Sequence, residues 1–174
     1  MIPSKLAKAE KLGVKIFLLN LIGAWFERRL GKKVGTEPGS EMKKAVEITK
    51  ELKINIFLID QDIKYTLKRF LQMVTRKEKI KFFKELIFGG KEDYNFNIKK
   101  IPSEKEISKI INKIRINYPS FYQVVVKERN IFMAKNLYKL MSLFSKDKIV
   151  SVIGAGHERA IVGEIKLLER TSLF

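Results

Sequence analysis

Apolar side chains recur every three or four positions along most of the chain, which is the spacing of one helical face. We predict helices over residues 6–30, 41–52, 62–74, 77–88, 107–114 and 119–144, and a last one after residue 157. Ser40 is the predicted cap of the second helix. Ser103 and Glu106 have the spacing of a capping box for the helix over 107–114, whose isoleucines are predicted to form a single buried stripe. The polar run over residues 91–100 is predicted to be a loop, or at most a short edge strand.

Two short apolar runs break this helical spacing, "INIFLID" over residues 54–60 and "IVSVI" over 149–153. Both are continuous and rich in β-branched residues, a pattern typical of strands that are buried on both faces. The alternation of helices with buried strands predicts an α/β fold, rich in helix, with a small central sheet flanked by helices. Because two strands are too few for a stable sheet, we expect residues 1–174 to form a single but incomplete domain.

The second predicted strand is followed by "GAGH", which contains His157, the only histidine of the sequence. Ligands of open α/β sheets bind beyond the carboxyl ends of the strands, where Asp60 is also placed. Gly154 and Gly156 would let the backbone turn tightly beside His157. Two interpretations stay open: the imidazole binds a metal or transfers a proton, or it only caps the following helix.

Other charged residues are candidates for the same site. Asp62, Tyr65 and Arg69 share one face of the helix over residues 62–74, where a solvated face with a local ion pair is the alternative. Glu128 and Arg129 interrupt an apolar helix, where charges must be paired or belong to a site. A structural salt bridge would also explain them.

The composition adds a formal charge of +17 and the absence of cysteine, which excludes disulfides and thiolate metal sites. The positive charge favours anionic partners, including an anionic membrane surface. The lysines and arginines are spread along the chain without a compact basic block, which indicates solvated helix faces rather than a nucleic-acid interface. The apolar run over residues 14–26 is too short to span a membrane and lacks a signal-peptide cleavage site. We therefore expect a cytoplasmic protein, or one peripheral to the membrane.

Three blocks of the sequence occur in the order of a known family. They are "ERRLGKKVGTEPGSEMKKAVEITKELKINIFLIDQDIKYTLKR", "VVVKERNIFMAKNL" and "KIVSVIGAGHERAIVGE", within a similarity that runs from about residue 18 to residue 164. They resemble the TraB/PrgY/GumN family of pheromone-shutdown proteins, which is related to the Tiki proteases. The resemblance implies a metal-dependent hydrolase on an α/β core, with histidines supplied by two G-x-x-H motifs.

The residues that match family motifs are Gly154 and His157 in the second G-x-x-H, Glu41 in "G-x-E-M", Asp60, Asp62 and Arg69 in "D-R-D-I…T-L-K-R", and Glu128 and Arg129 in "E-R-D". Gln61 stands where an arginine is usual, and Asn130 replaces the aspartate of "E-R-D". Both departures remove charge from the expected site.

The resemblance also implies roles. His157 and Asp60 would bind the metal, zinc or manganese, and Glu41 would be a ligand or the general base. Arg69 and Arg129 would hold substrate carboxylates or a developing oxyanion. The remaining binding positions would be Asp62, Glu128, Gly154 and Gly156.

The sequence contains one G-x-x-H motif where the family has two. We therefore expect this chain to correspond to the carboxyl-terminal part of a family domain and to bind metal only weakly. Two classes of function stay open. One is a hydrolase acting on peptides. The other is a non-catalytic basic module that binds a protein partner, an anionic membrane surface or nucleic acid. In either class, the missing strands predict self-association or capture of a complementary upstream segment.

Overall fold

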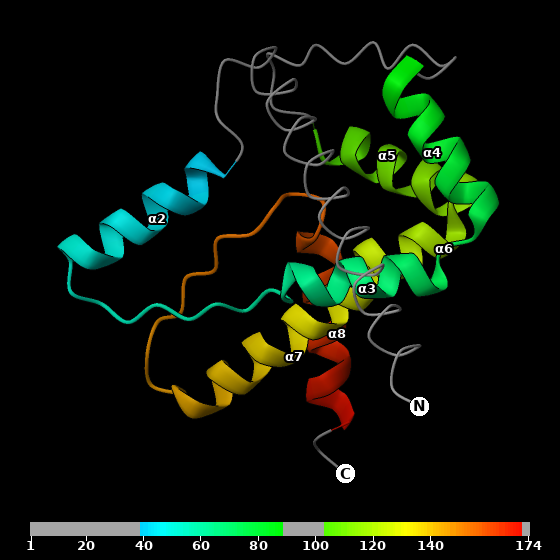
Figure 1. The fold of residues 1–174 in the computed structure, drawn as a ribbon. Helices are drawn as coiled ribbons and strands as arrows, with labels where there is room; N and C mark the ends of the chain where they lie inside the picture. Colours follow the sequence, from blue (N-terminus) through cyan, green and yellow to red (C-terminus); the bar gives the residue numbers. More distant parts are fainter. Residues whose placement is uncertain (1–38, 89–102, 172–174) are drawn as a thin grey trace, which may run out of the picture. The chain divides into compact units, whose positions relative to one another are not determined.

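The structure, a computed structural model, describes residues 39–88 and 103–171. The chain divides into two compact units, residues 1–54 and residues 55–174. The helix predicted over residues 6–30 and the loop predicted over residues 91–100 lie outside the described residues. Figure 1 shows the helices in chain order from α2 to α8.

In the first unit, the described residues form helix α2, Ser40–Glu51. The predicted cap was wrong by one position, since Ser40 is already helical and the capping residue is Gly39 with a φ of 81° and no side-chain bond. Glycine adopts this left-handed conformation without the steric penalty that other residues incur. After the helix, Lys53 has a φ of 55° and turns the chain, and the amide of Ile54 donates to the carbonyl of Thr49 at 3.1 Å.

The first helices of the second unit are α3, Ile63–Met73, and α4, Arg76–Phe88. Helix α3 lies within its predicted range, and α4 begins one residue before the predicted start. Asp62 caps α3 by accepting from the backbone N–H of Lys64 at 2.7 Å. On the inner side of α3, Thr66 and Phe70 are buried.

The capping box predicted at Ser103 and Glu106 is present at the start of helix α5, Glu104–Asn117. Both reciprocal bonds are formed, between the Ser103 side chain and the Glu106 backbone and between the Glu106 side chain and the Ser103 backbone. The isoleucine stripe of α5 is only partly buried, contrary to the prediction of a buried one.

The long helix predicted from Pro119 consists of three continuous parts. They are helix α6, Pro119–Tyr122, a π-helical segment, Gln123–Lys127, and helix α7, Glu128–Leu143. The carboxylate of Glu78 on α4 accepts from the backbone N–H groups of Ser120 and Phe121, which are free donors in the first turn of α6. The first turn of α6 is thereby attached to α4.

Helix α8, Glu158–Thr171, packs against α7 and completes the core. Figure 1 shows α7 in yellow and α8 in red crossing beside one another. The buried residues of this contact are Met133 and Ala134 on α7 and Ile161 on α8. Partly buried side chains surround them: Ile59, Leu137, Ile153 and Ile165. The α7–α8 contact therefore lies directly beside the two runs that were predicted to be strands.

The predicted α/β fold is wrong for the part of the chain that the structure describes, in which every regular element is helical. Residues 54–59 and 149–153 follow non-helical paths, but neither forms a strand. A strand is defined by hydrogen bonds to a neighbouring strand, and the described residues form no such ladder. The apolar pattern correctly indicated where the chain leaves the helical conformation. It could not show whether another segment pairs with these residues.

None of the described helices combines the length and the apolar character that are required to cross a membrane.

Candidate functional site

His157 lies in the turn between residues 149–153 and helix α8. Its backbone N–H donates to the carbonyl of Gly154 at 2.9 Å, and its own carbonyl accepts the N–H of Ile161 at 3.0 Å, the first bond of α8. Neither Gly154 nor Gly156 has a left-handed backbone, and a Cβ at either would make an ordinary contact at 3.5 Å. The turn therefore does not require glycine for the steric reason that the sequence suggested.

The imidazole of His157 is held by Asn130, a buried residue on the first turn of α7. Nδ1 lies 2.5 Å from Oδ1 of Asn130, and only 3% of Asn130 is exposed. Because an amide oxygen only accepts hydrogen bonds, this pairing places the proton on Nδ1 and leaves the lone pair on Nε2. Burial lowers the pKa of His157, the positive charge of Arg129 lowers it further, and Asp60 partly opposes both. The geometry thus favours a neutral imidazole with Nε2 as its acceptor.

Asp60 and Arg129 form an ion pair beside this histidine. Nε and Nη2 of Arg129 donate to the two carboxylate oxygens of Asp60 at 3.2 Å and 2.5 Å. Burial raises the pKa of the Asp60 carboxyl, but the bond from Arg129, the charge of Arg129, the N–H of Gln61 and the charge of His157 together bring it below the usual value. The two-pronged geometry fixes the orientation of both groups.

A second ion pair joins α3 to α7. Nε and Nη2 of Arg69 donate to the carboxylate oxygens of Glu128 at 3.0 Å and 2.6 Å. The hydrogen bond that Arg69 donates to Glu128 raises the pKa of Arg69. Both side chains are largely shielded, with exposed fractions of 28% and 19%. Glu128 and Arg129 are therefore both found in ion pairs, as the salt-bridge interpretation expected, and the pair of Arg129 with Asp60 also acts on His157.

The three consecutive residues at the start of α7 reach three different segments. Glu128 binds Arg69 on α3, Arg129 binds Asp60 in the loop before α3, and Asn130 binds His157 before α8. Successive helical residues point about 100° apart, so the side chains of one turn can contact three different segments. The π-helical segment lies directly before this turn, and such segments are frequent at functional sites.

Asn130 was not predicted as a site residue and was identified only as a departure from the family motif. The available signal was its position, a polar amide next to two charged residues in an otherwise apolar helix. A buried amide must find a hydrogen-bond partner, and His157 is that partner.

Among the described residues, the hydrogen bonds and ion pairs of this group do not include two predicted residues, Asp62 and Glu41. Asp62 is exposed and its carboxylate is used to cap α3. Glu41 is exposed in the first turn of α2, which belongs to the first unit, whereas the group around His157 is built from the second unit. Gln61, which replaces the usual arginine, donates to the hydroxyl of Thr66 at 2.8 Å.

The donor chemistry around His157 does not fit a complete metal site on its own. The described residues contain no cluster of three or more His, Cys, Asp or Glu side chains that could hold a metal ion. Both carboxylate oxygens of Asp60 are already bound by Arg129. A catalytic zinc site usually takes three protein ligands, so His157 and Asp60 alone are insufficient.

Comparison with known proteins agrees with the motifs in the sequence. The model of the TraB/PrgY/gumN family matches residues 8–172. An uncharacterized protein of Methanocaldococcus jannaschii is 40% identical over 154 residues, which cover 88% of this chain and 38% of that protein. This chain thus spans well under half the length of that relative. No solved structure matches this chain. The resemblance read from the sequence is confirmed: the chain belongs to the TraB/PrgY/gumN family.

Proposed function

We propose that this chain carries the histidine-bearing part of a hydrolase site that acts on peptides. The observation that supports this most strongly is the bond that Nδ1 of His157 donates to buried Asn130, beside the pair of Asp60 and Arg129. A histidine that only capped a helix would not need a buried amide to orient its ring. Here four side chains from three distant parts of the sequence lie together: Asp60, Arg129, Asn130 and His157. The bond from Nδ1 to Asn130 leaves Nε2 of His157 as an acceptor.

In this proposal His157 takes a proton from the attacking water or binds a metal through Nε2, since both roles use the same lone pair. Its lowered pKa keeps the imidazole neutral at pH 7. Arg129 holds Asp60 in place, and the pair of Arg69 and Glu128 braces α3 against α7. Because both arginines are already bound to carboxylates, we assign them to positioning rather than to holding the substrate.

A divalent metal, zinc or manganese, would polarise the scissile carbonyl or activate water if it were bound. The group around His157 offers too few ligands, so tight binding would need donors from outside the described residues. The role of Glu41 as ligand or general base is proposed from the family resemblance alone. We therefore expect the isolated chain to bind metal weakly and to cleave peptides negligibly.

Calorimetric titration with zinc and with manganese tests this proposal. We expect weak binding by the chain alone, and tighter binding after addition of a family segment that carries a strand, a G-x-x-H motif and a second strand. His157→Ala should abolish this gain in metal affinity. Its circular dichroism spectrum should match that of the wild type, which shows that the variant is folded. Tight binding by the chain alone that survives His157→Ala, or no gain from the added segment, would overturn the proposal.

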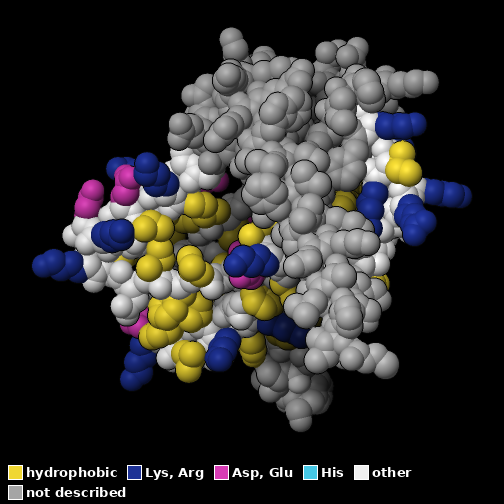
Figure 2. Space-filling model, in the orientation of Figure 1, with side chains coloured by type: hydrophobic (Ala, Val, Ile, Leu, Met, Phe, Trp, Pro, Cys, Tyr) yellow, Lys and Arg dark blue, Asp and Glu magenta, His cyan; other side chains and the backbone are white. Residues whose placement is uncertain are grey.

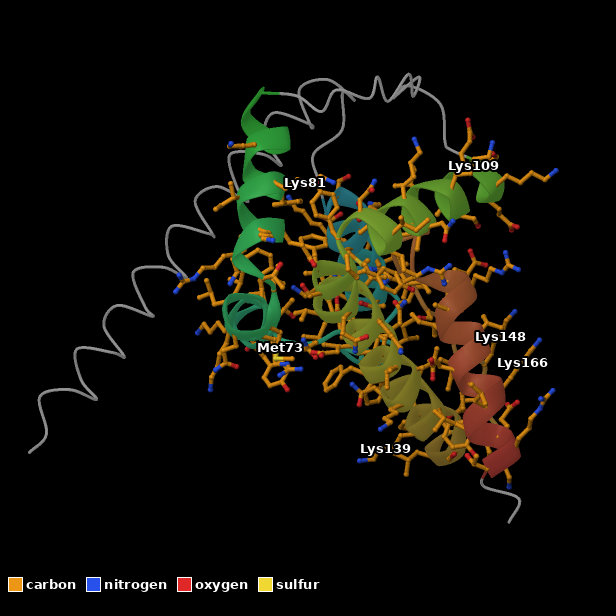
Figure 3. The ribbon with its side chains drawn as sticks, turned by 90° about the vertical axis from the view of Figure 1, so that its right-hand side faces the viewer. Met73, Lys81, Lys109, Lys139, Lys148 and Lys166 are labelled. Carbon is orange, nitrogen blue, oxygen red and sulfur yellow. The ribbon has the colours of Figure 1, made fainter. Side chains whose placement is uncertain are left out.

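The surplus positive charge supports a second candidate, a non-catalytic module that binds an anionic membrane surface. Lys139, Lys148 and Lys166 are exposed, and Figure 3 shows their side chains directed outward. Such binding is electrostatic and is screened by salt. Sedimentation with vesicles should show binding to anionic lipid that is lost near 1 M salt. Equal binding to neutral vesicles would contradict this candidate.

A further inference from the structure

The two runs that the sequence marked as strands end side by side at the candidate site. Residues 55–59 lead into Asp60, and residues 149–153 lead into the turn of His157. Their last residues, Ile59 and Ile153, both pack against the core between α7 and α8. The carboxyl ends of the two segments therefore pack against the same part of the core.

Within the described residues, the backbone of both segments has no sheet partner. Among the described residues, the contacts of residues 55–59 include the Nδ2 of Asn136, which donates to the carbonyl of Ile59 at 3.0 Å, and the ring of Phe144, which contacts Phe57. No backbone hydrogen bond links residues 55–58 or 149–152 to another described segment. These N–H and C=O groups form two edges that can accept a strand.

The side chains of these edges are apolar and exposed. Leu58 is 90% exposed and Val150 is 78% exposed, values that are unusual for large apolar residues in a β-branched run. The other exposed members are Ile56, Phe57, Ile149 and Val152. Figure 2 shows hydrophobic side chains gathered on this face with lysine and arginine around them. A contiguous apolar patch with a polar rim is typical of an interaction site.

We propose that residues 55–58 and 149–152, together called the open-strand surface, bind an apolar β-strand that a partner polypeptide donates and that carries acidic residues at its ends. A strand satisfies the backbone groups and covers the apolar side chains in one step. The inference stands on this geometry and is independent of the hydrolase proposal.

Other occupants fit less well. Lipid cannot satisfy exposed N–H and C=O groups, and a docked helix would leave them unpaired. A second copy of this chain would bring together two molecules that each carry a formal charge of +17. Lys146 and Lys148 precede the second segment, with one carboxylate, Asp147, between them. Acidic residues at the ends of the incoming strand would complement this charge.

Hydrogen–deuterium exchange of the full chain, with designed peptides as probes, tests the proposal. The peptide is about ten residues long, enough for one strand, with alternating valine and threonine between paired aspartates. It should slow exchange of the amides of residues 55–58 and 149–152 by about tenfold or more. The same peptide with a central proline cannot complete the ladder and should give no protection. A lysine-flanked version should bind about tenfold more weakly at low salt.

Variants of the chain separate this surface from general stickiness. Leu58→Lys and Val150→Lys lie at highly exposed positions and should remove the protection without unfolding the chain. Ile116→Lys, at an exposed apolar position on α5, is the matched control and should keep it. Protection by the proline peptide, protection confined to other residues, or protection of the same amides by dimerisation without peptide would overturn the proposal.

Discussion

Replacing Asn130 by alanine should release the imidazole of His157 from its present tautomer. The Nδ1–Oδ1 distance of 2.5 Å and the burial of Asn130 indicate that this bond holds the proton on Nδ1. Without the acceptor, a half-buried N–H loses its partner, and the neutral ring should redistribute its proton toward Nε2.

The size of the effect follows from the value of one hydrogen bond. A net contribution of about 1 kcal/mol changes the tautomer ratio by about fivefold. Asn130→Ala should also destabilise the fold by about 1–3 kcal/mol, because it leaves a buried polar group unsatisfied. Because His157 is the only histidine, nitrogen-15 NMR of histidine-labelled protein reports this ring without ambiguity. The spectrum is recorded at a pH where the ring is neutral.

Asn130→Asp is the matched control, since it keeps an acceptor of the same size at Nδ1. The Nδ1-protonated tautomer should persist, and the added negative charge should raise the pKa of His157. A wild-type ring that carries its proton on Nε2 would refute the reasoning, as would an unchanged tautomer ratio in Asn130→Ala.

Four further predictions concern the core, the pH dependence of His157 and of Asp60, and the charge. Ile161→Ala should lower the free energy of unfolding by about 2–5 kcal/mol in urea denaturation, whereas Val162→Ala, at the exposed neighbouring position, should change it by less than about 0.5 kcal/mol; equal effects would contradict the assigned core. Because the pKa of His157 is lowered on folding, the unfolded chain takes up this proton first, so stability should fall as the pH drops below about 6.5, and His157→Gln should remove that slope. Asp60 has a lowered pKa, so its stabilising contribution is present above the usual carboxyl range and should be lost as the pH falls through the folded value; urea denaturation of Asp60→Asn as a function of pH should lack this acid step. If the positive charge only solvates helices, binding to nucleic acid should be weak and should disappear at moderate salt in an anisotropy titration, whereas nanomolar, sequence-selective binding would show a dedicated interface.

The helices could be predicted from the sequence because their determinants are local. The spacing of apolar residues located the ranges of α3, α4 and α7, and the capping box at Ser103 and Glu106 depends on residues three positions apart. The boundary at Gly39 was missed by one position because serine and glycine are both accepted as caps.

The sheet was predicted wrongly, because a strand needs a partner that its own residues do not specify. Residues 54–59 and 149–153 have strand composition, yet the described residues provide no ladder for them. The same limit applies to the site. The sequence marked Glu128 and Arg129 as charges in need of partners, but only the packing of α3 and α7 assigns Arg69 to one and Asp60 to the other. Asn130 was missed because its partner is distant in sequence.

The central claim is that His157, Asp60 and Arg129 form one electrostatic unit. NMR titration of the single imidazole in three variants tests it most directly. Arg129→Met removes a positive charge and should raise the pKa of His157, whereas Asp60→Asn removes a negative charge and should lower it. Lys166→Met, at an exposed position on α8, should leave it unchanged. An imidazole pKa that is the same in all of these proteins would contradict the site.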